Sequence, residues 1–297
     1  MGRITARTRV TRITLGESSA ETTVSRREDV LAVEEPLEIR VGGTSLSITM
    51  RTPGHDFDLA AGFLISEGVV AHTGEIAAIR YCAGVNDVPS TGSGRRGENT
   101  FNVLDVTLAK GVAAPDPSLE RNFYMTSSCG LCGKASIDAV RTASHHANPH
   151  DPLVIDASVL ASFPDRLRAG QEVFDKTGGL HAAALFDGRT GEMLVLREDV
   201  GRHNAVDKVI GWAHGEGLLP LTGMVLQVSG RASFELTQKA SMAGIPILAA
   251  VSAPSSLAID LAEESGMTVV GFMRGRSMVV YAGEQRVAVP ALAEVAQ

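Results

Sequence analysis

The stretch that decides the fold is residues 224–272, MVLQVSGRASFELTQKASMAGIPILAAVSAPSSLAIDLAEESGMTVVGF. It contains apolar runs at 224–228, 245–251 and 267–272, and the longer stretches 233–242 and 255–264 between them have helical character. Strands that alternate with helices of this length form βαβ units, in which neighbouring strands are parallel. The sequence therefore predicts an α/β fold with a parallel sheet in the C-terminal half.

The carboxyl ends of these expected strands carry small and basic residues. They are Ser229-Gly230-Arg231, Ser252–Ser256 and Phe272–Arg276. Ligands of open parallel sheets bind beyond the carboxyl ends of the strands. Small residues let backbone amides approach a ligand, helix N-termini favour anions, and arginine offers forked donors to phosphate. Helix capping would explain any one of these loops alone. Their coincidence at three strand ends favours a site for a phosphate-bearing ligand.

Shorter elements are expected upstream. Residues 29–50 alternate apolar and polar positions around Gly42-Gly43, which predicts two strands joined by a glycine turn. A helix should follow Asp56 and Asp58, and further strands are expected at 75–82 and 99–108. We therefore expect a smaller β-rich N-terminal lobe over residues 28–115.

The remaining boundaries follow from composition. Residues 1–27 begin with four arginines before the first acid, which predicts a flexible basic arm. Residues 84–97 are rich in Gly, Ser and Arg, as in an exposed loop. We expect a mobile loop and linker at 116–150, the C-terminal α/β lobe at 151–285 and a tail at 286–297. Within the α/β lobe, strands are expected at 181–186 and 193–197, and a helix at 203–214.

Bulk composition excludes several classes of protein. The net charge of −7 argues against a general nucleic-acid binder, which needs a surplus of Lys and Arg. No apolar run reaches the roughly 20 residues of a membrane span, and residues 1–15 lack the apolar core of a secretory signal. Three cysteines do not suggest a disulfide framework. The expected location is the reducing cytoplasm.

The segment Cys129-Gly130-Leu131-Cys132 is the strongest candidate for covalent chemistry. A helix is expected at 135–141, so the cysteines would lie at or just before its N-terminus. The helix dipole and Lys134 would there favour the thiolate over the thiol. An exposed thiol pair is a liability that a purely structural loop does not need.

Zinc binding is the strongest alternative on spacing alone. Cys129, Cys132, His145 and His150 match the Cys2His2 spacing of a zinc finger. The positions of the aromatic and leucine residues that form the core of such a finger hold Ser136 and Thr142 instead. We therefore expect no structural zinc, although a transient metal site stays open.

Two further alternatives rest on single motifs. A C-x-x-C pair that opens a helix is also typical of thioredoxin-like proteins, but there it follows an early strand of a small domain. His181-Ala182-Ala183 occupies the pattern of the H-x-E of zinc deaminases, whose Glu is the general acid and base. Residue 183 is alanine and the C-x-x-C precedes His181, so deamination is not expected.

Five ordered motifs together resemble the formate dehydrogenase accessory sulfurtransferases, the FdhD family, over about residues 28–280. They are Ser128–Gly133, Phe174–Ala183, Glu198–Lys208, Ser229–Arg231 and Gly271–Arg274. The resemblance implies a cytidine-deaminase-like three-layer α/β fold without deaminase chemistry, as a homodimer. It further implies that sulfur passes from a cysteine desulfurase, as a persulfide, to the molybdenum of bis-molybdopterin guanine dinucleotide, for formate dehydrogenase maturation.

The resemblance also assigns residues. Cys129 matches the persulfide-bearing position and Cys132 its partner. The cofactor, for which GDP is a mimic, is expected at Phe272, Met273, Arg274, Gly275, Arg276 and Ser277, together with Ser229, Gly230 and Arg231. We expect Arg202, His203 and Asp199 to line the same groove, although Asp199 could equally cap a helix. A chaperone that binds the cofactor without carrying sulfur is the second functional class, and the thiol pair favours the first.

Overall fold

The structure is a computed structural model that describes residues 3–17, 21–82, 101–115, 144, 146 and 151–289. Several expectations concern residues outside these ranges. They are the loop with Cys129 and Cys132, the helix at 135–141, the zinc alternative's His145 and His150, and the loop at 84–97.

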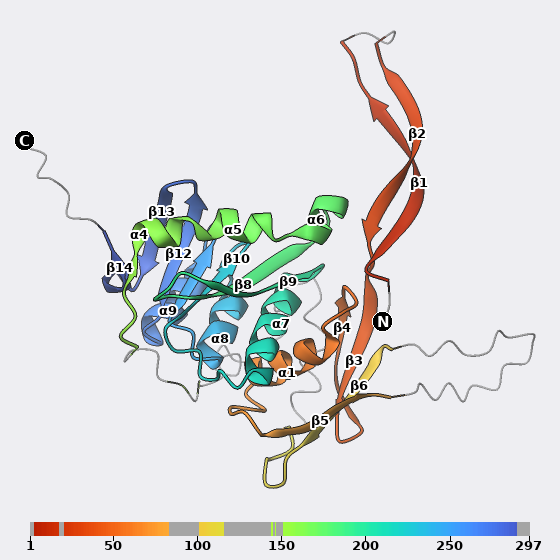
Figure 1. Cartoon of the computed structure of the whole chain (residues 1–297). Coiled ribbons are helices and arrows are strands. Elements are labelled where there is room, and N and C mark those ends of the chain that lie inside the picture. Colours follow the sequence, from red (N-terminus) through yellow and green to blue (C-terminus); the bar gives the residue numbers. More distant parts are fainter. Residues whose placement is uncertain are drawn as a thin grey trace, which may run out of the picture.

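A mixed sheet forms the centre of the C-terminal lobe (Figure 1). Its strands are β8 (His181–Asp187), β9 (Met193–Asp199), β10 (Met224–Val228), β11 (Ile247–Ala250), β12 (Thr268–Arg274) and β13 (Ser277–Ala282), in the order β13-β12-β11-β10-β8-β9. The prediction of parallel strands is confirmed for β10, β11 and β12. The other strands, β8, β9 and β13, run antiparallel to their neighbours, so the sheet as a whole is mixed.

Helices cover both faces of this sheet. The helices α7 (Arg202–Gly215), α8 (Phe234–Met242) and α9 (Ser256–Glu264) lie on one face, and α4 (Ala157–Ala161), α5 (Phe163–Ala169) and α6 (Glu172–Thr177) lie on the other (Figure 1). The strands consequently feed two cores, with Leu226 and Leu248 on the α7–α9 side and Val225 and Ile247 on the α5 side. The three layers agree with the expected architecture. None of the helices in the described ranges has the length and apolar character needed to span a membrane.

The N-terminal lobe is a four-stranded sheet with one helix. Its strands are β3 (Glu35–Val41), β4 (Thr44–Arg51), β5 (Ile76–Tyr81) and β6 (Val103–Leu108), in the order β4-β3-β6-β5, and its helix is α1 (Asp56–Ser66). The predicted turn at Gly42-Gly43 joins β3 to β4, and both glycines have positive φ. Helix α1 packs closely on α7, since a Cβ at Gly62 would lie 1.8 Å from the Asp207 carbonyl oxygen. The two lobes therefore share one core.

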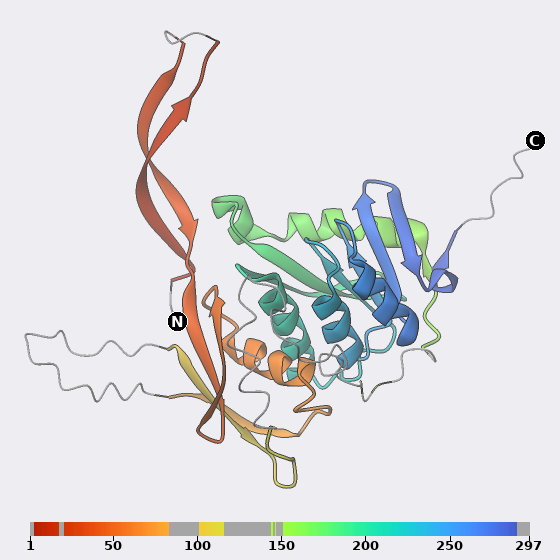
Figure 2. The ribbon, with the colours of Figure 1, turned by 180° about the vertical axis from the view of Figure 1, so that it is seen from behind.

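The expectation of a flexible arm at 1–27 is wrong for most of that segment. Strands β1 (Thr5–Thr14) and β2 (Thr23–Ala32) pair in antiparallel register, from Thr5 opposite Ala32 to Thr14 opposite Thr23. The arginines of β1 are interspersed with threonine, valine and isoleucine, and most side chains of both strands are exposed, which suits a two-stranded ribbon. The ribbon projects from the body (Figure 2).

The C-terminal boundary also differs from the expected one. The short strands β7 (Ile155–Asp156) and β14 (Val287–Ala288) pair in parallel, and Arg286 is buried and donates to the Gly266 carbonyl. Residues 286–288 thus belong to the fold and not to a tail.

Candidate functional site

A cavity of about 710 Å³ lies at the carboxyl ends of β10, β11 and β12, below α5 and α6. Ser229, Val251 and Met273 come from the three strand ends, and Arg274 and Gly275 continue the third. His181, at the start of β8, closes another side. The structure thus brings together four of the residues expected to bind the cofactor: Ser229, Met273, Arg274 and Gly275.

Backbone hydrogen bonds tie the three strand ends together. The Ser252 N–H donates to the Gly230 carbonyl at 3.3 Å, and the Phe272 N–H donates to the Ser252 carbonyl at 3.2 Å. The third end leads into a hairpin to β13, so unlike the other two it does not start a helix. A register shift between Gly271 and Arg274 interrupts the ladder there.

Phe272 lies within this irregular segment. It has a φ of 50°, which is rare for an aromatic residue, and strained residues of this kind concentrate at functional sites. Its side chain is exposed, whereas the neighbouring Met273 is buried. The irregularity therefore presents an aromatic ring to solvent, but Phe272 does not itself line the cavity as its chain neighbours Met273 and Arg274 do.

The two arginines that line the cavity, Arg168 and Arg274, differ in whether a carboxylate already pairs with them. Arg168, on α5, pairs with Asp175 at 2.6 Å, whereas Arg274 forms no ion pair with any described residue. Burial lowers the pKa of His181, and the nearby Arg202 and His203 lower it further. His181 is therefore neutral at pH 7, and Arg274 is the cavity cation most available to an anion.

The first turn of α7 brings Arg202 and His203 toward His181. The Arg202 Nε and the His203 Nε2 are buried and have no hydrogen-bond partner among the described residues. The His203 Nε2 lies 3.9 Å from a Glu235 carboxylate oxygen, and His203 is the main reason that the pKa of Glu235 falls to about 2. Neither Arg202 nor His203 lines the cavity in the described part of the chain, although both lower the pKa of His181, so the expectation that they line the groove stays a prediction.

The other expected site residues lie differently. Gly230 is next to the cavity, because a Cβ there would lie 3.7 Å from the His181 Nδ1. Arg231, Arg276 and Ser277 are exposed, and they do not line the cavity in the described part of the chain.

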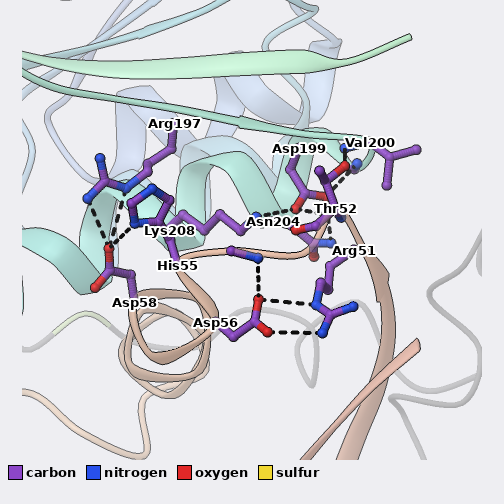
Figure 3. Close-up of polar contacts among 12 residues, drawn as sticks. Arg51, Thr52, His55, Asp56, Asp58, Arg197, Asp199, Val200, Asn204 and Lys208 are labelled. Atoms are coloured by element: carbon purple, nitrogen blue, oxygen red, sulfur yellow. Dashed lines mark hydrogen bonds and ion pairs between the residues drawn. The ribbon is translucent and has the colours of Figure 1, made fainter. Parts of the chain in front are cut away.

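Asp199 does not line the groove, which corrects that part of the expectation. Its side chain is fully buried, and its Oδ1 accepts from the Gly201 N–H at 2.8 Å and the Asn204 Nδ2 at 3.0 Å. Its Oδ2 accepts from the Thr52 N–H at 3.1 Å and pairs with the Lys208 Nζ at 2.7 Å (Figure 3). Asp199 is not the helix cap of the alternative expectation either, because the N-cap of α7 is Gly201; its carboxylate instead holds the Gly201 N–H just before the helix.

Sequence reasoning missed the residues of the N-terminal lobe that meet this network. Buried Arg51 donates to both carboxylate oxygens of Asp56, at 3.1 and 2.9 Å (Figure 3). Arg197 similarly pairs with Asp58 at 3.0 Å, from β9 to α1. The sequence feature that could have indicated these contacts is the turn Thr52-Pro53-Gly54 between strand and helix, which the charged residue Arg51 directly precedes.

No group of three or more His, Cys, Asp or Glu side chains is placed to hold a metal ion within the residues that the structure describes. Cys129 and Cys132 lie outside those residues. The expectation that they hold no structural zinc therefore stays a prediction.

Comparison with known proteins supplies the family context. Residues 32–288 match the model of the FdhD/NarQ family. The chain is 61% identical to a sulfur carrier protein FdhD of Streptomyces avermitilis over 99% of both chains. It is 56% identical to the protein of the same name from Mycobacterium tuberculosis, over 97% of this chain and 100% of that one.

A solved structure supports the fold. The crystal structure of a formate dehydrogenase accessory protein from Desulfotalea psychrophila superimposes with a TM-score of 0.68 and 20% sequence identity. The match covers 95% of this chain and 99% of that one. The mixed α/β architecture is thus shared at low sequence identity.

Proposed function

Because the chain belongs to the FdhD/NarQ family, we propose that it carries sulfur from a cysteine desulfurase to the molybdenum of bis-molybdopterin guanine dinucleotide. The recipient cofactor would serve a formate dehydrogenase. The observation that carries the proposal is the similarity to sulfur carrier proteins over 99% of the chain. We also propose that the three-layer fold is of the cytidine-deaminase-like type.

The sulfur step is assigned to Cys129. Its thiolate attacks the outer sulfur of a donor persulfide, forms a new S–S bond and releases the donor's thiolate. Cys129 then presents the outer sulfur to the acceptor, and Cys132 is its partner. This assignment rests on the family motif and on thiol chemistry, since both cysteines lie outside the described residues.

The cavity at the strand ends fits the nucleotide end of such a cofactor. It offers a phosphate the guanidinium of Arg274, which has no ion-pair partner among the described residues, and it offers a neutral His181 for a hydrogen bond. Phe272 offers an exposed ring face to a base or pterin. Arg202 adds positive charge near His181, and its Nε has no hydrogen-bond partner among the described residues. When bound, the cofactor supplies the molybdenum that accepts sulfur, and these residues bind and orient it.

Titration calorimetry with GDP tests the cofactor half of the proposal. Loss of a charge-assisted contact from Arg274 costs about 1.5–3 kcal/mol, so Arg274→Ala should weaken GDP binding by roughly ten- to a hundredfold. Arg189→Ala is the matched control, because Arg189 is exposed in the turn at the other end of β8 and should leave the affinity unchanged. Absence of GDP binding by the parent protein would contradict this half of the proposal.

A cofactor-binding chaperone without covalent sulfur is the alternative class. The two classes differ in whether formate dehydrogenase maturation requires Cys129. Formate dehydrogenase should stay inactive when matured with Cys129→Ala, even though the variant binds GDP normally. Full activation by that variant would favour the chaperone.

The proposal also includes cytoplasmic location and a homodimer. Light scattering of the purified protein tests the second of these, since it should report twice the mass of one chain. A monomer at micromolar concentration would contradict it.

A further inference from the structure

We propose that the buried pair Asp199–Lys208 is a positioning pair for the cofactor site, which fixes the first turn of α7 against the N-terminal lobe. Through that turn it would set the positions of Arg202 and His203. The inference rests on the proposed function, because it concerns the same cavity. Neither Asp199 nor Lys208 lines that cavity.

The hydrogen-bond network around Asp199 and Lys208 is complete. Asp199 has 0% and Lys208 has 1% of its side chain exposed. Both carboxylate oxygens of Asp199 are saturated, as described above, and the Lys208 Nζ also donates to the Thr52 carbonyl at 2.8 Å (Figure 3). A buried ion pair is weak support for stability, since well-packed apolar residues often serve equally well, and fixing one geometry is a better-attested use.

The same network spans the two lobes. Thr52 is joined three times: its N–H donates to Asp199 at 3.1 Å, its Oγ1 accepts from the Val200 N–H at 3.1 Å, and its carbonyl accepts from Lys208. Asn204 adds a bond to the Met50 carbonyl at 2.7 Å. The end of β4 is therefore fixed against the junction of β9 and α7.

The junction of β9 and α7 is linked to the cavity through His181. Asp199 lies opposite His181 in the β8–β9 ladder, and His181 lines the cavity. The Arg202 Nε has no hydrogen-bond partner among the described residues, and the His203 Nε2 lies 3.9 Å from a Glu235 carboxylate oxygen, so the backbone of the first turn decides where both side chains begin. The carboxylate of Asp199 holds that backbone through the Gly201 N–H at 2.8 Å.

The same helix carries a matched control. The Lys239 Nζ lies 2.9 Å from both carboxylate oxygens of Asp207, with 9% and 3% of these side chains exposed. This second buried Lys–Asp pair joins α7 to α8, and Ser66 of α1 donates to Asp207 at 2.7 Å. It lines no part of the cavity.

The experiment compares Lys208→Met with Lys239→Met. Each leaves a buried aspartate without its cation, so both should lower the urea midpoint of unfolding by similar amounts. Only Lys208→Met should weaken GDP binding, by roughly tenfold or more, which is the size expected for a lost charge-assisted contact. The imidazole NMR signals of His181 and His203 in ligand-free protein should shift in Lys208→Met and stay unchanged in Lys239→Met.

Milder variants keep the test valid if a lysine variant does not fold. Thr52→Val removes the acceptor of the Val200 N–H, and Ser66→Ala removes the hydroxyl that donates to Asp207. Thr52→Val should weaken GDP binding and Ser66→Ala should not. Equal GDP affinity of all four variants and the parent, or equal loss in both members of a pair, would overturn the positioning role. Failure of the parent to bind GDP would instead contradict the proposed function.

Discussion

Replacing Arg51 by methionine tests the contact that holds the strand-to-helix turn of the N-terminal lobe. Arg51 has 1% of its side chain exposed and contacts Asp56, Glu35, Asn102 and the Phe101 carbonyl. Methionine fills part of the same volume but leaves the buried Asp56 carboxylate without its cation.

The structure sets the size of the expected effect. Breaking a buried ion pair by removing one partner costs about 3–5 kcal/mol. Asp56 keeps two donors, the Gly54 N–H at 3.1 Å and the Tyr81 hydroxyl at 3.0 Å. Glu35, with 38% of its side chain exposed, can be solvated by water. We therefore expect the lower end of the range, about 3 kcal/mol.

Urea unfolding at neutral pH measures this loss. Arg40→Met is the matched control, because Arg40 makes the same kind of two-point contact with Glu38, at 2.9 Å, but has 36% of its side chain exposed. A partly exposed pair contributes about 0–1 kcal/mol. If the two variants lost equal free energy of unfolding, or Arg51→Met lost less than about 1 kcal/mol, the reasoning from burial would be refuted.

Two further predictions concern the pH dependence and the packing of the body. Burial lowers the pKa of His214, His55 and His181 below 6.5, so their contribution to stability is present above that pH and is lost as the pH falls through the lowered values. The free energy of unfolding should therefore fall as the pH is lowered from about 7.5 to about 5. His214→Gln should make this fall smaller, and an unchanged fall would contradict the role of His214. Gly62→Ala should destabilise the protein by about 1–3 kcal/mol or more, because its Cβ would meet the α7 backbone. Gly215→Ala is the control and should not destabilise the protein, since a Cβ at Gly215 would meet open space. Equal melting temperatures of the two variants would contradict the close packing of α1 on α7.

The sequence predicted the parts of the fold that local pattern determines. Strands β10, β11 and β12 and helices α7, α8 and α9 follow apolar periodicity, and their expected bounds differ from the observed ones by a few residues. The direction of β8, β9 and β13 depends on hairpin turns that the alternation of strand and helix does not reveal. The short helices α4, α5 and α6 contain too few turns for a periodic signal.

The ribbon escaped prediction for a different reason. An arginine-rich beginning is typical of a solvated tail, and only the pairing with residues 23–32 turns it into a strand. The family model begins at residue 32, the last residue of β2.

The candidate site was partly accessible from sequence. Ser229, Met273 and Arg274 could be grouped in advance because topology alone brings the carboxyl ends of neighbouring strands together. Thr52 and Lys208 could not, since they meet across the two lobes and lie 156 residues apart in the chain. Burial, which converts such polar residues into a positioning network, is a property of the folded chain.

Intact-mass measurement of sulfur loading tests the central claim most directly. The protein is incubated with L-cysteine and a cysteine desulfurase, and its intact mass is then measured by mass spectrometry with and without a thiol reductant. The account predicts a gain of one sulfur atom that the reductant removes, and no gain for Cys129→Ala. Equal sulfur loading of Cys129→Ala and the parent protein would contradict the assignment of the carrier thiol, and no loading of either would contradict the sulfur-carrier function itself.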